Sequence, residues 1–192
     1  MKKVLGPIAI IVVILVVLGV MLVPKYNKFV NLEENVDQSY AQVETQLQRR
    51  IDLIPNLVNT VKGYASHEKE VIKDISDARA KLSGARGPEE QAAADGELSN
   101  ALGRLLVVVE NYPDLKANQN FAQLMDELAG TENRISVARK DYNDVVADYN
   151  RQIKRFPGKI VASMFGFDKK EYFKADVAAN EAPEVDFGDN SD

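Results

Sequence analysis

The sequence predicts an all-α protein, an antiparallel bundle of about four long helices preceded by one N-terminal transmembrane helix. Three observations support this fold class. The chain begins with a long uncharged run, apolar residues then recur at steps of three and four, and the breaks between these stretches contain proline, glycine or asparagine. Amphipathic helices bury their apolar faces by packing against one another, so a bundle is expected.

The run from Val4 to Val23, VLGPIAIIVVILVVLGVMLV, contains no charged residue. About 20 helical residues are enough to span a hydrocarbon core of roughly 30 Å. A secretory signal peptide is the alternative, because Lys2 and Lys3 give a basic start, but the run is long for one and no small-x-small cleavage site follows it. We expect residues 1–25 to form an uncleaved, single-pass membrane anchor.

The side of the membrane on which the rest of the chain lies stays open. Lys2 and Lys3 precede the apolar run, whereas Lys25 and Lys28 follow it. The numbers of positive charges on the two sides are nearly equal, with a slight excess that favours a cytoplasmic amino terminus.

After the anchor, four stretches carry apolar residues at helical spacing, as in a bundle or coiled coil. They cover residues 29–61, 66–82, 88–112 and 118–156. Only Pro24 separates the first stretch from the membrane run, so the two are expected to form one long helix. We assign residues 26–173 to a single helical-bundle domain.

The helix ends follow from local signals. Ser66 is the expected N-cap of the second helix, since its hydroxyl can accept a hydrogen bond from an orphan amide. The segment LLVVVE in the third stretch resembles a buried strand, but the periodic pattern around it is much longer than a strand and favours a helix. Pro157 and Gly158 end the fourth helix, and KIVASMFGF after them is expected to add a last helical turn or two.

The segment RRIDLIPNLV places a proline inside the first of these helices. The apolar residues on both sides of Pro55 keep their register, so the helix is expected to continue with a kink. Pro55 has no amide donor and crowds the carbonyl group of Ile51, at a cost of roughly 3 kcal/mol in a regular helix. Asn56 and Asn59 are candidates to supply the missing hydrogen bond.

Three charged residues, Arg49, Arg50 and Asp52, precede this proline at the edge of the apolar face. We expect Arg50 to form an ion pair with Glu132 or Glu110, which lie where the apolar faces of the fourth and third helices falter or end. Such a pair would fix the register of the helices, and simple solvation of Arg50 is the alternative.

Several kinds of chemistry find no support in the sequence. Without cysteine the chain has no disulfide, no cysteine-ligated metal site and no thiol nucleophile. The segment HEKE at His67 lacks the second histidine of a zinc-protease helix. A net charge of -5, with both signs mixed along the chain, gives no extended basic surface for nucleic acid. We expect no catalytic residue, no cofactor, no metal and no nucleic-acid partner.

Residues 174–192 form an acidic tail that is expected to be disordered, because it has no lysine or arginine after Lys174. Val185 and Phe187 alternate in the short apolar segment APEVDF. They are candidates to bind a partner protein, by adding to the edge of its sheet or by docking in a groove.

Long segments of the chain resemble the LemA family of bacterial proteins in order and spacing. They are YNKFVNLEENVDQSYAQVETQLQRRIDLIPNLVNTVKGYASHE, ENYPDLKANQNFAQLMDELAGTENRISVARKDYNDVVADYN, FPGKIVASMFGF and KEYF, between Tyr26 and Phe173. The resemblance implies an amino-terminal membrane helix, a helical bundle and no established enzymatic activity. Some proteins of this kind are associated with magnetosomes, which are specialised membranes, so membrane organisation is an expectation by analogy.

The sequence therefore favours a membrane-anchored interaction or scaffold protein of the cell envelope that self-assembles. Its expected partners are the lipid bilayer, further copies of itself, and a protein bound through a bundle face or the acidic tail. An envelope-stress or signalling adaptor and a membrane-associated enzyme are the alternatives. An enzyme would need a cleft with several titratable groups of perturbed pKa.

Overall fold

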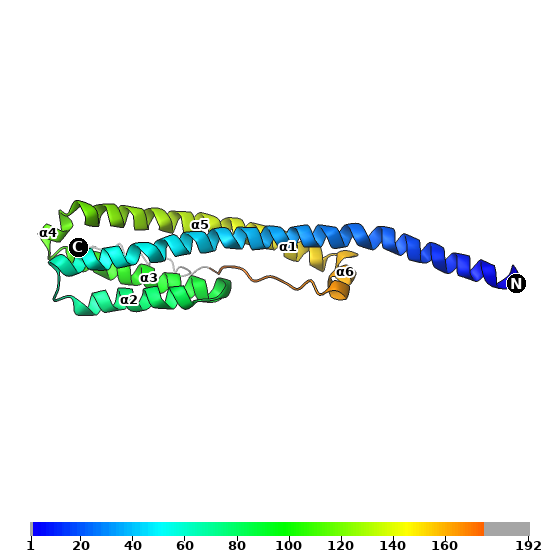
Figure 1. Cartoon of the computed structure of the whole chain (residues 1–192), viewed down its shortest axis with the longest axis horizontal. Coiled ribbons are helices and arrows are strands. Elements are labelled where there is room, and N and C mark those ends of the chain that lie inside the picture. The colour runs from blue at the N-terminus through cyan, green and yellow to red at the C-terminus, as the bar shows by residue number, and fades with distance from the viewer. Residues whose placement is uncertain (1, 175–192) are drawn as a thin grey trace, which may run out of the picture. The chain divides into compact units, whose positions relative to one another are not determined.

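The computed structural model describes residues 2–174, and every regular element in that range is an α-helix (Figure 1). The helices are α1 Lys2–Tyr64, α2 Lys69–Gly84, α3 Gly87–Val109, α4 Pro113–Lys116, α5 Gln119–Lys154 and α6 Gly158–Phe165. The predicted all-α fold class is confirmed.

The contacts between residues divide the chain into two compact units. Of the described residues, unit 1 comprises 2–47 and 131–172, and unit 2 comprises 48–130 together with 173 and 174. Helices α1 and α5 each contribute residues to both units. The predicted limits of a single bundle domain, residues 26 and 173, stay predictions.

Helix α1 is one helix from Lys2 to Tyr64. It includes the apolar run and the first periodic stretch, and it continues through both Pro24 and Pro55. The expectation of one long helix is confirmed.

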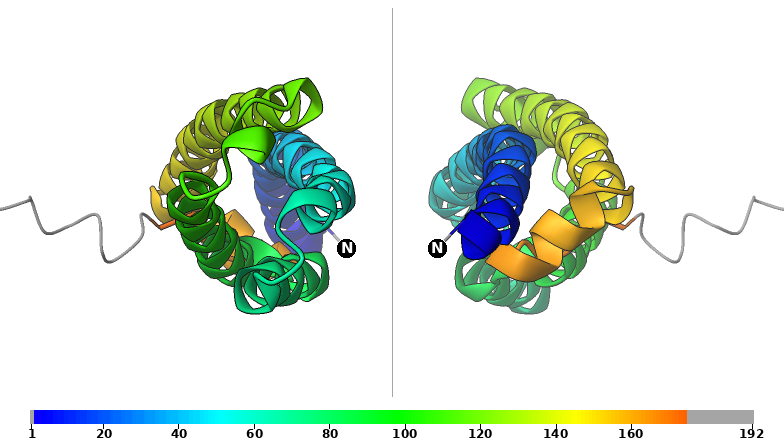
Figure 2. Two further views of the ribbon diagram at one scale, coloured as in Figure 1. Left: turned by 90° about the vertical axis from the view of Figure 1, so that its left-hand side faces the viewer. Right: turned by 90° about the vertical axis from the view of Figure 1, so that its right-hand side faces the viewer.

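Unit 2 contains a hairpin of α2 and α3, which are connected by Ala85 and Arg86. So short a connection makes the two helices antiparallel neighbours, and Figures 1 and 2 show them side by side. Their buried faces include Ile72, Ile75, Ala78 and Leu82 of α2 and Ala94, Leu98, Leu102, Leu105 and Val109 of α3. Most of LLVVVE lies in α3, so this segment is helical as expected.

The predicted start of α2 is wrong, because the helix begins at Lys69 and no side chain caps it. Residues 65–68 instead form a turn, in which the amide of Glu68 donates to the carbonyl oxygen of Ala65 over 3.1 Å. Ala65 is buried, so packing holds this turn where Ser66 would have begun a helix.

The predicted end of α3 is also wrong, since the helix stops at Val109 and not at Tyr112. The amide of Tyr112 still donates to the carbonyl oxygen of Val109 over 2.9 Å. Pro113 then opens the short helix α4, where its missing amide costs little.

Unit 1 is built from α1, α5 and α6. The buried side chains of these helices include Phe29, Val36, Val43, Leu47, Ile135, Tyr142, Val146, Tyr149, Ile153, Val161 and Ala162. On α5, Val146 is fully buried, whereas its neighbour Val145 is only partly buried.

The chain leaves α6 at Gly166, whose φ of 76° is a left-handed conformation that glycine adopts without steric cost. The irregular segment that follows is held by Asn150. The side-chain Nδ2 of Asn150 donates to the carbonyl oxygen of Lys170 over 2.9 Å, and its Oδ1 accepts from the amide of Lys170 over 3.0 Å. The Nζ of Lys170 also lies 2.6 Å from Oε1 of Glu33.

Most side chains of the predicted transmembrane run, Val4–Val23, lie outside the part of the chain whose side chains the structure describes. Within the described part, no helix has both the length and the apolar character needed to cross a bilayer. The acidic tail from residue 175 onward lies outside the described residues as well.

Candidate functional site

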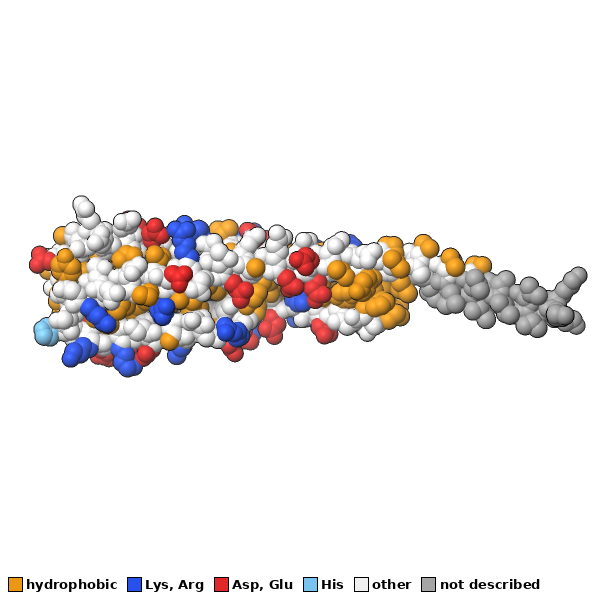
Figure 3. Space-filling model, in the orientation of Figure 1, with side chains coloured by type: hydrophobic (Ala, Val, Ile, Leu, Met, Phe, Trp, Pro, Cys, Tyr) orange, Lys and Arg blue, Asp and Glu red, His pale blue; other side chains and the backbone are white. Residues whose placement is uncertain are grey.

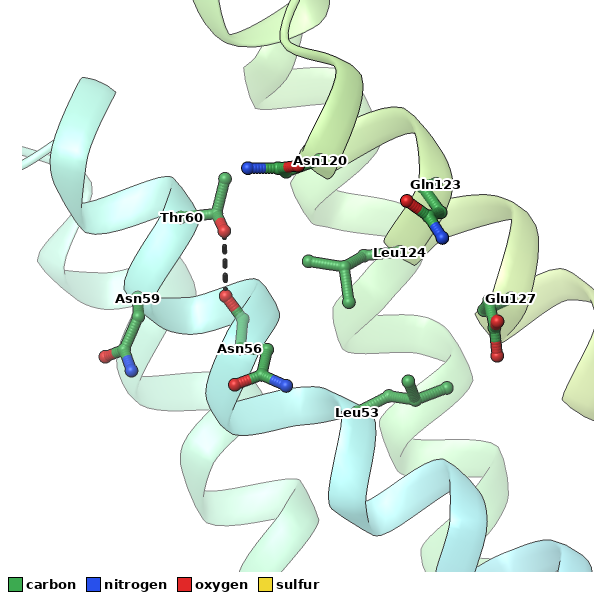
Figure 4. A pocket seen from close by; sticks show the side chains of 8 residues that line it. All are labelled: Leu53, Asn56, Asn59, Thr60, Asn120, Gln123, Leu124 and Glu127. Carbon is green, nitrogen blue, oxygen red and sulfur yellow. Dashed lines mark hydrogen bonds between the residues drawn. The ribbon is translucent and has the colours of Figure 1, made fainter.

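In unit 2 the last turns of α1 and the first turns of α5 flank a groove of about 490 Å³ (Figure 4). Its lining consists of Leu53, Asn56, Asn59 and Thr60 from α1, and Asn120, Gln123, Leu124 and Glu127 from α5. Leu53 and Leu124 point from their helices towards the opposite helix. The hydroxyl of Thr60 donates to the carbonyl oxygen of Asn56 over 2.9 Å. The remaining lining is mostly amide, and an amide side chain both donates and accepts hydrogen bonds.

Helix α1 passes this groove intact because another helix supplies the hydrogen bond that Pro55 removes. Pro55 has no N–H group, so the carbonyl oxygen of Ile51 lacks its usual donor within the helix. The Nε of Arg79, on α2, donates to that oxygen over 3.1 Å. The donor is therefore Arg79 and not the predicted Asn56 or Asn59, whose side chains line the groove.

An ion pair borders the groove. The Nη2 of Arg49 on α1 lies 3.0 Å from Oε2 of Glu127 on α5. The two side chains are 53% and 39% exposed, so the pair contributes at most about 1 kcal/mol. Asp52, the third charged residue before Pro55, accepts a hydrogen bond of 2.8 Å from Nε2 of Gln48 within its own helix.

Arg50 lies in the core of unit 2, with 3% of its side chain exposed. Its Nη1 donates to Oδ1 of Asp95 over 2.6 Å, and its Nη2 donates to the hydroxyl of Ser99 over 3.0 Å. The side chain of Asp95 is 2% exposed, so both charges are removed from water and each depends on the other. Asp95 is absent from the predicted site, although its position three residues before Leu98 places it on the apolar face of α3.

Of the two carboxylates predicted for Arg50, Glu110 has another partner in the structure. Glu110 follows the end of α3, where its Oε2 lies 2.6 Å from the Nζ of Lys116. Glu132 belongs to unit 1, and its pairing with Arg50 stays a prediction. Within unit 2, the carboxylate that pairs with Arg50 is that of Asp95.

Side-chain hydrogen bonds hold the segments that follow α1 and precede α5, the two helices that line the groove. The hydroxyl of Tyr112 donates to Oε1 of Glu68 over 2.7 Å, and this bond raises the pKa of Tyr112 above its ordinary value. The Nδ2 of Asn118 donates to the hydroxyl of Tyr64 over 2.9 Å, and its Oδ1 accepts from the amide of Phe121 over 2.9 Å. Asn118 thus acts as the N-cap of α5.

The groove is built for hydrogen bonding and not for proton transfer. Glu127 is the one lining residue with a titratable side chain, and Arg49 lies against it. His67 is exposed in the turn between α1 and α2. Among the described residues, no group of three histidine, aspartate or glutamate side chains is placed to hold a metal ion. Asparagine, glutamine and threonine side chains suit the recognition of peptide groups and other amides.

Two of the predicted interaction residues, Val185 and Phe187, lie outside the described residues. Of the remainder, Asn56 lines the groove, Arg49 pairs with its lining residue Glu127, and Arg50 is buried in the core of unit 2. The residues that the sequence did not single out are Arg79, Asp95, Asn120, Gln123 and Glu127.

Comparison with known proteins relates the chain to one group. The model of the LemA family matches residues 39–187. Magnetosome protein MamQ 2 of Paramagnetospirillum magneticum (strain ATCC 700264 / AMB-1) is 31% identical over 185 residues, covering 83% of this chain and 68% of that protein. Magnetosome protein MamQ of Magnetospirillum gryphiswaldense is 31% identical over 198 residues, covering 88% of this chain and 73% of that protein. Protein LemA of Metamycoplasma hominis is 23% identical over 154 residues, covering 80% of this chain and 70% of that protein.

Proposed function

Since this chain belongs to the LemA family, we propose that it is a membrane-anchored interaction or scaffold protein of the bacterial cell envelope, without catalytic activity. Relatives named magnetosome proteins support a role in organising a membrane, because magnetosomes are specialised membranes. The bilayer and a second protein chain are the partners in this proposal.

The observation that carries the proposal is the continuity of α1. This helix begins in the uncharged run and ends at Tyr64, and its residues from Leu53 to Thr60 form one wall of the amide-lined groove. No loop separates the apolar run from that wall. A single-pass anchor over residues 1–25 would therefore connect the bilayer to the groove through helix alone.

The chemistry of the groove favours a protein segment as its occupant. Six of its eight lining residues are polar, and five of these carry amide or hydroxyl groups. Such groups bond the N–H and C=O groups of a peptide, whereas the single carboxylate, Glu127, is already approached by Arg49. We propose that a segment of another protein chain, either a second copy or a distinct partner, binds here.

Site-specific photo-crosslinking in intact cells tests this function. A photoreactive residue at Asn59 or Gln123, on opposite walls of the groove, is expected to give an adduct of higher mass. The same residue at Ala80, which is exposed on α2, is the control and is expected to give none. An adduct of two identical chains favours self-assembly, and an adduct with one other protein favours an adaptor. If neither groove position reacts and the full-length protein in detergent stays a monomer by light scattering, the proposal is wrong.

The anchor has a separate test. Lys2 and Lys3 favour a cytoplasmic amino terminus, which would place the soluble part outside the cytoplasm. Protease added to intact cells is then expected to degrade residues beyond Tyr26. Protection of this region in intact cells, with cleavage after the membrane is opened, would reverse the orientation. Release of the protein by carbonate washing would argue against the anchor itself.

A further inference from the structure

Helix α6 is apolar on two of its faces. Val161 and Ala162 are buried against unit 1. Phe156, Ile160 and Met164, spaced by four residues, are 83%, 50% and 60% exposed. Ile160 and Met164 are four residues apart within α6, so they lie on one face of the helix, which points away from the core, and Phe156 is exposed just before α6 begins. A helix that is apolar on both sides is typical of burial in a core or contact with lipid, and only the inner face has a core to meet.

Aromatic contacts hold α6 beside the part of α1 that follows the apolar run. The ring centroid of Tyr26 lies 4.9 Å from that of Phe165 and 5.7 Å from that of Phe167, and Phe29 lies 5.4 Å from Phe167. Tyr26 comes three residues after Val23, which is about 4.5 Å along a helix axis. Helix α6 is therefore attached at the end of the predicted transmembrane run.

We call the exposed apolar side chains of α6, of Phe156 before it and of the adjoining part of α1 the α6 surface. It consists of Val23, Tyr26, Phe156, Ile160, Met164 and Phe165. All six side chains are at least 38% exposed. Figure 3 shows hydrophobic side chains gathered over α6 and the neighbouring part of α1.

The segments that carry the α6 surface contain basic but no acidic residues, and Glu33 and Asp168 follow directly after them. No aspartate or glutamate occurs from residue 149 to 167, whereas Lys154, Arg155 and Lys159 are exposed there. On α1, residues 24–32 likewise contain Lys25 and Lys28 and no acidic residue. An apolar area bordered by lysine and arginine is complementary to a bilayer surface that carries anionic headgroups. Two copies of the same basic area would repel each other, which disfavours a second chain as the cover.

We propose that the α6 surface lies in the interfacial region of a bilayer containing anionic lipids, as a second membrane contact beside the α1 anchor. This inference rests on the membrane anchoring proposed above. Ile160 and Met164 reach the boundary between headgroups and acyl chains, Tyr26 lies at headgroup level, and Lys154, Arg155 and Lys159 meet lipid phosphates.

The absence of cysteine from the chain allows single labels to be placed. An environment-sensitive fluorophore is attached to Ile160→Cys or Met164→Cys in the full-length protein, reconstituted in vesicles of phosphatidylcholine and phosphatidylglycerol. Val13→Cys, inside the apolar run, reports on the anchor, and Val137→Cys, 59% exposed on the unit 1 part of α5, is the matched control. All four positions are exposed, so the substitutions spare the core, and circular dichroism checks the helix content.

A nitroxide on the upper acyl chain of the lipid is expected to quench the labels at residues 160 and 164, and a nitroxide near the end of the acyl chain is expected to quench the label at residue 13, which lies in the middle of the apolar run. The expected loss of emission at residues 160 and 164 is at least about twofold, with little change at residue 137. Quenching at residue 13 without quenching at residues 160 and 164 would overturn the α6 contact and leave the anchor standing. No quenching at residue 13 would reject the anchor, and with it the basis of this inference. The label at residue 160 could show blue-shifted emission that the lipid nitroxide does not quench. If a crosslinker attached at the same cysteine then joined two chains, a protein would be the cover of this surface and the proposal would be overturned.

The basic residues have their own control. Replacement of Arg155 and Lys159 by glutamine is expected to reduce the quenching at residue 164 in phosphatidylglycerol vesicles and to leave it unchanged in vesicles of phosphatidylcholine alone. Equal quenching of the altered and unaltered proteins in both kinds of vesicle would contradict the role of charge in the contact.

Discussion

The Nε of Arg79 donates a hydrogen bond to the carbonyl oxygen of Ile51 over 3.1 Å. This oxygen is four residues before Pro55 and is the acceptor that an ordinary residue 55 would satisfy through its amide. A side chain of α2 thus completes the backbone hydrogen bonding of α1. The same contact ties α2 to α1 in unit 2 at a position where proline interrupts the hydrogen bonding of α1.

Replacing Arg79 with methionine is expected to lower the free energy of unfolding by about 1–2 kcal/mol, because the carbonyl group of Ile51 loses its donor. In a chain that also carries Pro55→Ala, the alanine amide can supply the intrahelical bond, so the loss on Arg79→Met is expected to be smaller. Urea unfolding of the four proteins of this double-mutant cycle measures the difference. An equal cost in both backgrounds would mean that the bond to Ile51 is not what makes Arg79 stabilising.

Loss of Asp95 is expected to be much more damaging than loss of an exposed partner. Asp95→Ala would remove the buried carboxylate that faces Arg50 and is expected to cost about 3–5 kcal/mol. Asp144→Ala, which breaks an exposed pair with Lys140, is the control and is expected to leave the stability almost unchanged. Similar midpoints in urea for the two variants would show that the Arg50–Asp95 pair is energetically unimportant.

The sequence predicted the fold where the signal is local and failed where it depends on packing. Apolar spacing identified the helical stretches, and Pro157 with Gly158 marked the end of α5 to within two residues. Ser66 has the chemistry of an N-cap, but the burial of Ala65 and the bond from Tyr112 to Glu68 keep residues 65–68 in a turn.

The candidate site shows the same division. The effect of Pro55 on Ile51 follows from covalent geometry and is predictable, whereas the donor that compensates comes from Arg79, 28 residues away. For Arg50, the sequence likewise predicts that a charged side chain beside the apolar face requires a partner of opposite charge. Its choice of Asp95 depends on how α3 lies against α1 in unit 2, and spacing along one helix carries no information about that register.

Gly158→Ala is expected to displace α6 from unit 1. A Cβ atom at residue 158 would lie 2.5 Å from the backbone oxygen of Gln152 and 2.9 Å from Cζ of Phe29. Backbone cannot yield as a flexible side chain can, so the substitution is expected to cost about 1–3 kcal/mol. Gly103→Ala is the matched control, since its Cβ would meet no atom within 4 Å and alanine should stabilise α3 by up to about 1 kcal/mol. Thermal unfolding followed by circular dichroism compares the two, and an unchanged or raised Tm for Gly158→Ala would contradict the close packing.

Asn150→Ala is expected to release the segment that follows α6. The Asn150 side chain makes two hydrogen bonds to the backbone of Lys170, and their loss is expected to cost about 2 kcal/mol. Limited trypsin digestion provides the measurement, because Lys169 and Lys170 become cleavable once the segment detaches. Asn27→Ala, at an exposed position of α1, is the control and is expected to keep the native digestion rate. Equal rates for the two variants would show that other contacts hold the segment.

Alkaline solution is expected to destabilise the protein through two tyrosines of unit 1. Burial is the main cause that raises the pKa of Tyr142 and of Tyr149 to about 12, from about 10 in an unfolded chain. Between these values the folded protein keeps protons that the unfolded chain has lost, so this contribution to stability is complete below about pH 10 and falls as the pH rises towards about 12. Ionisation of Tyr142 would also remove its bond to the carbonyl oxygen of Glu171, 3.0 Å away. Unfolding midpoints in urea measured from neutral to alkaline pH should fall less steeply for the double variant Tyr142→Phe, Tyr149→Phe than for the unaltered protein, and parallel curves would exclude both tyrosines as the cause.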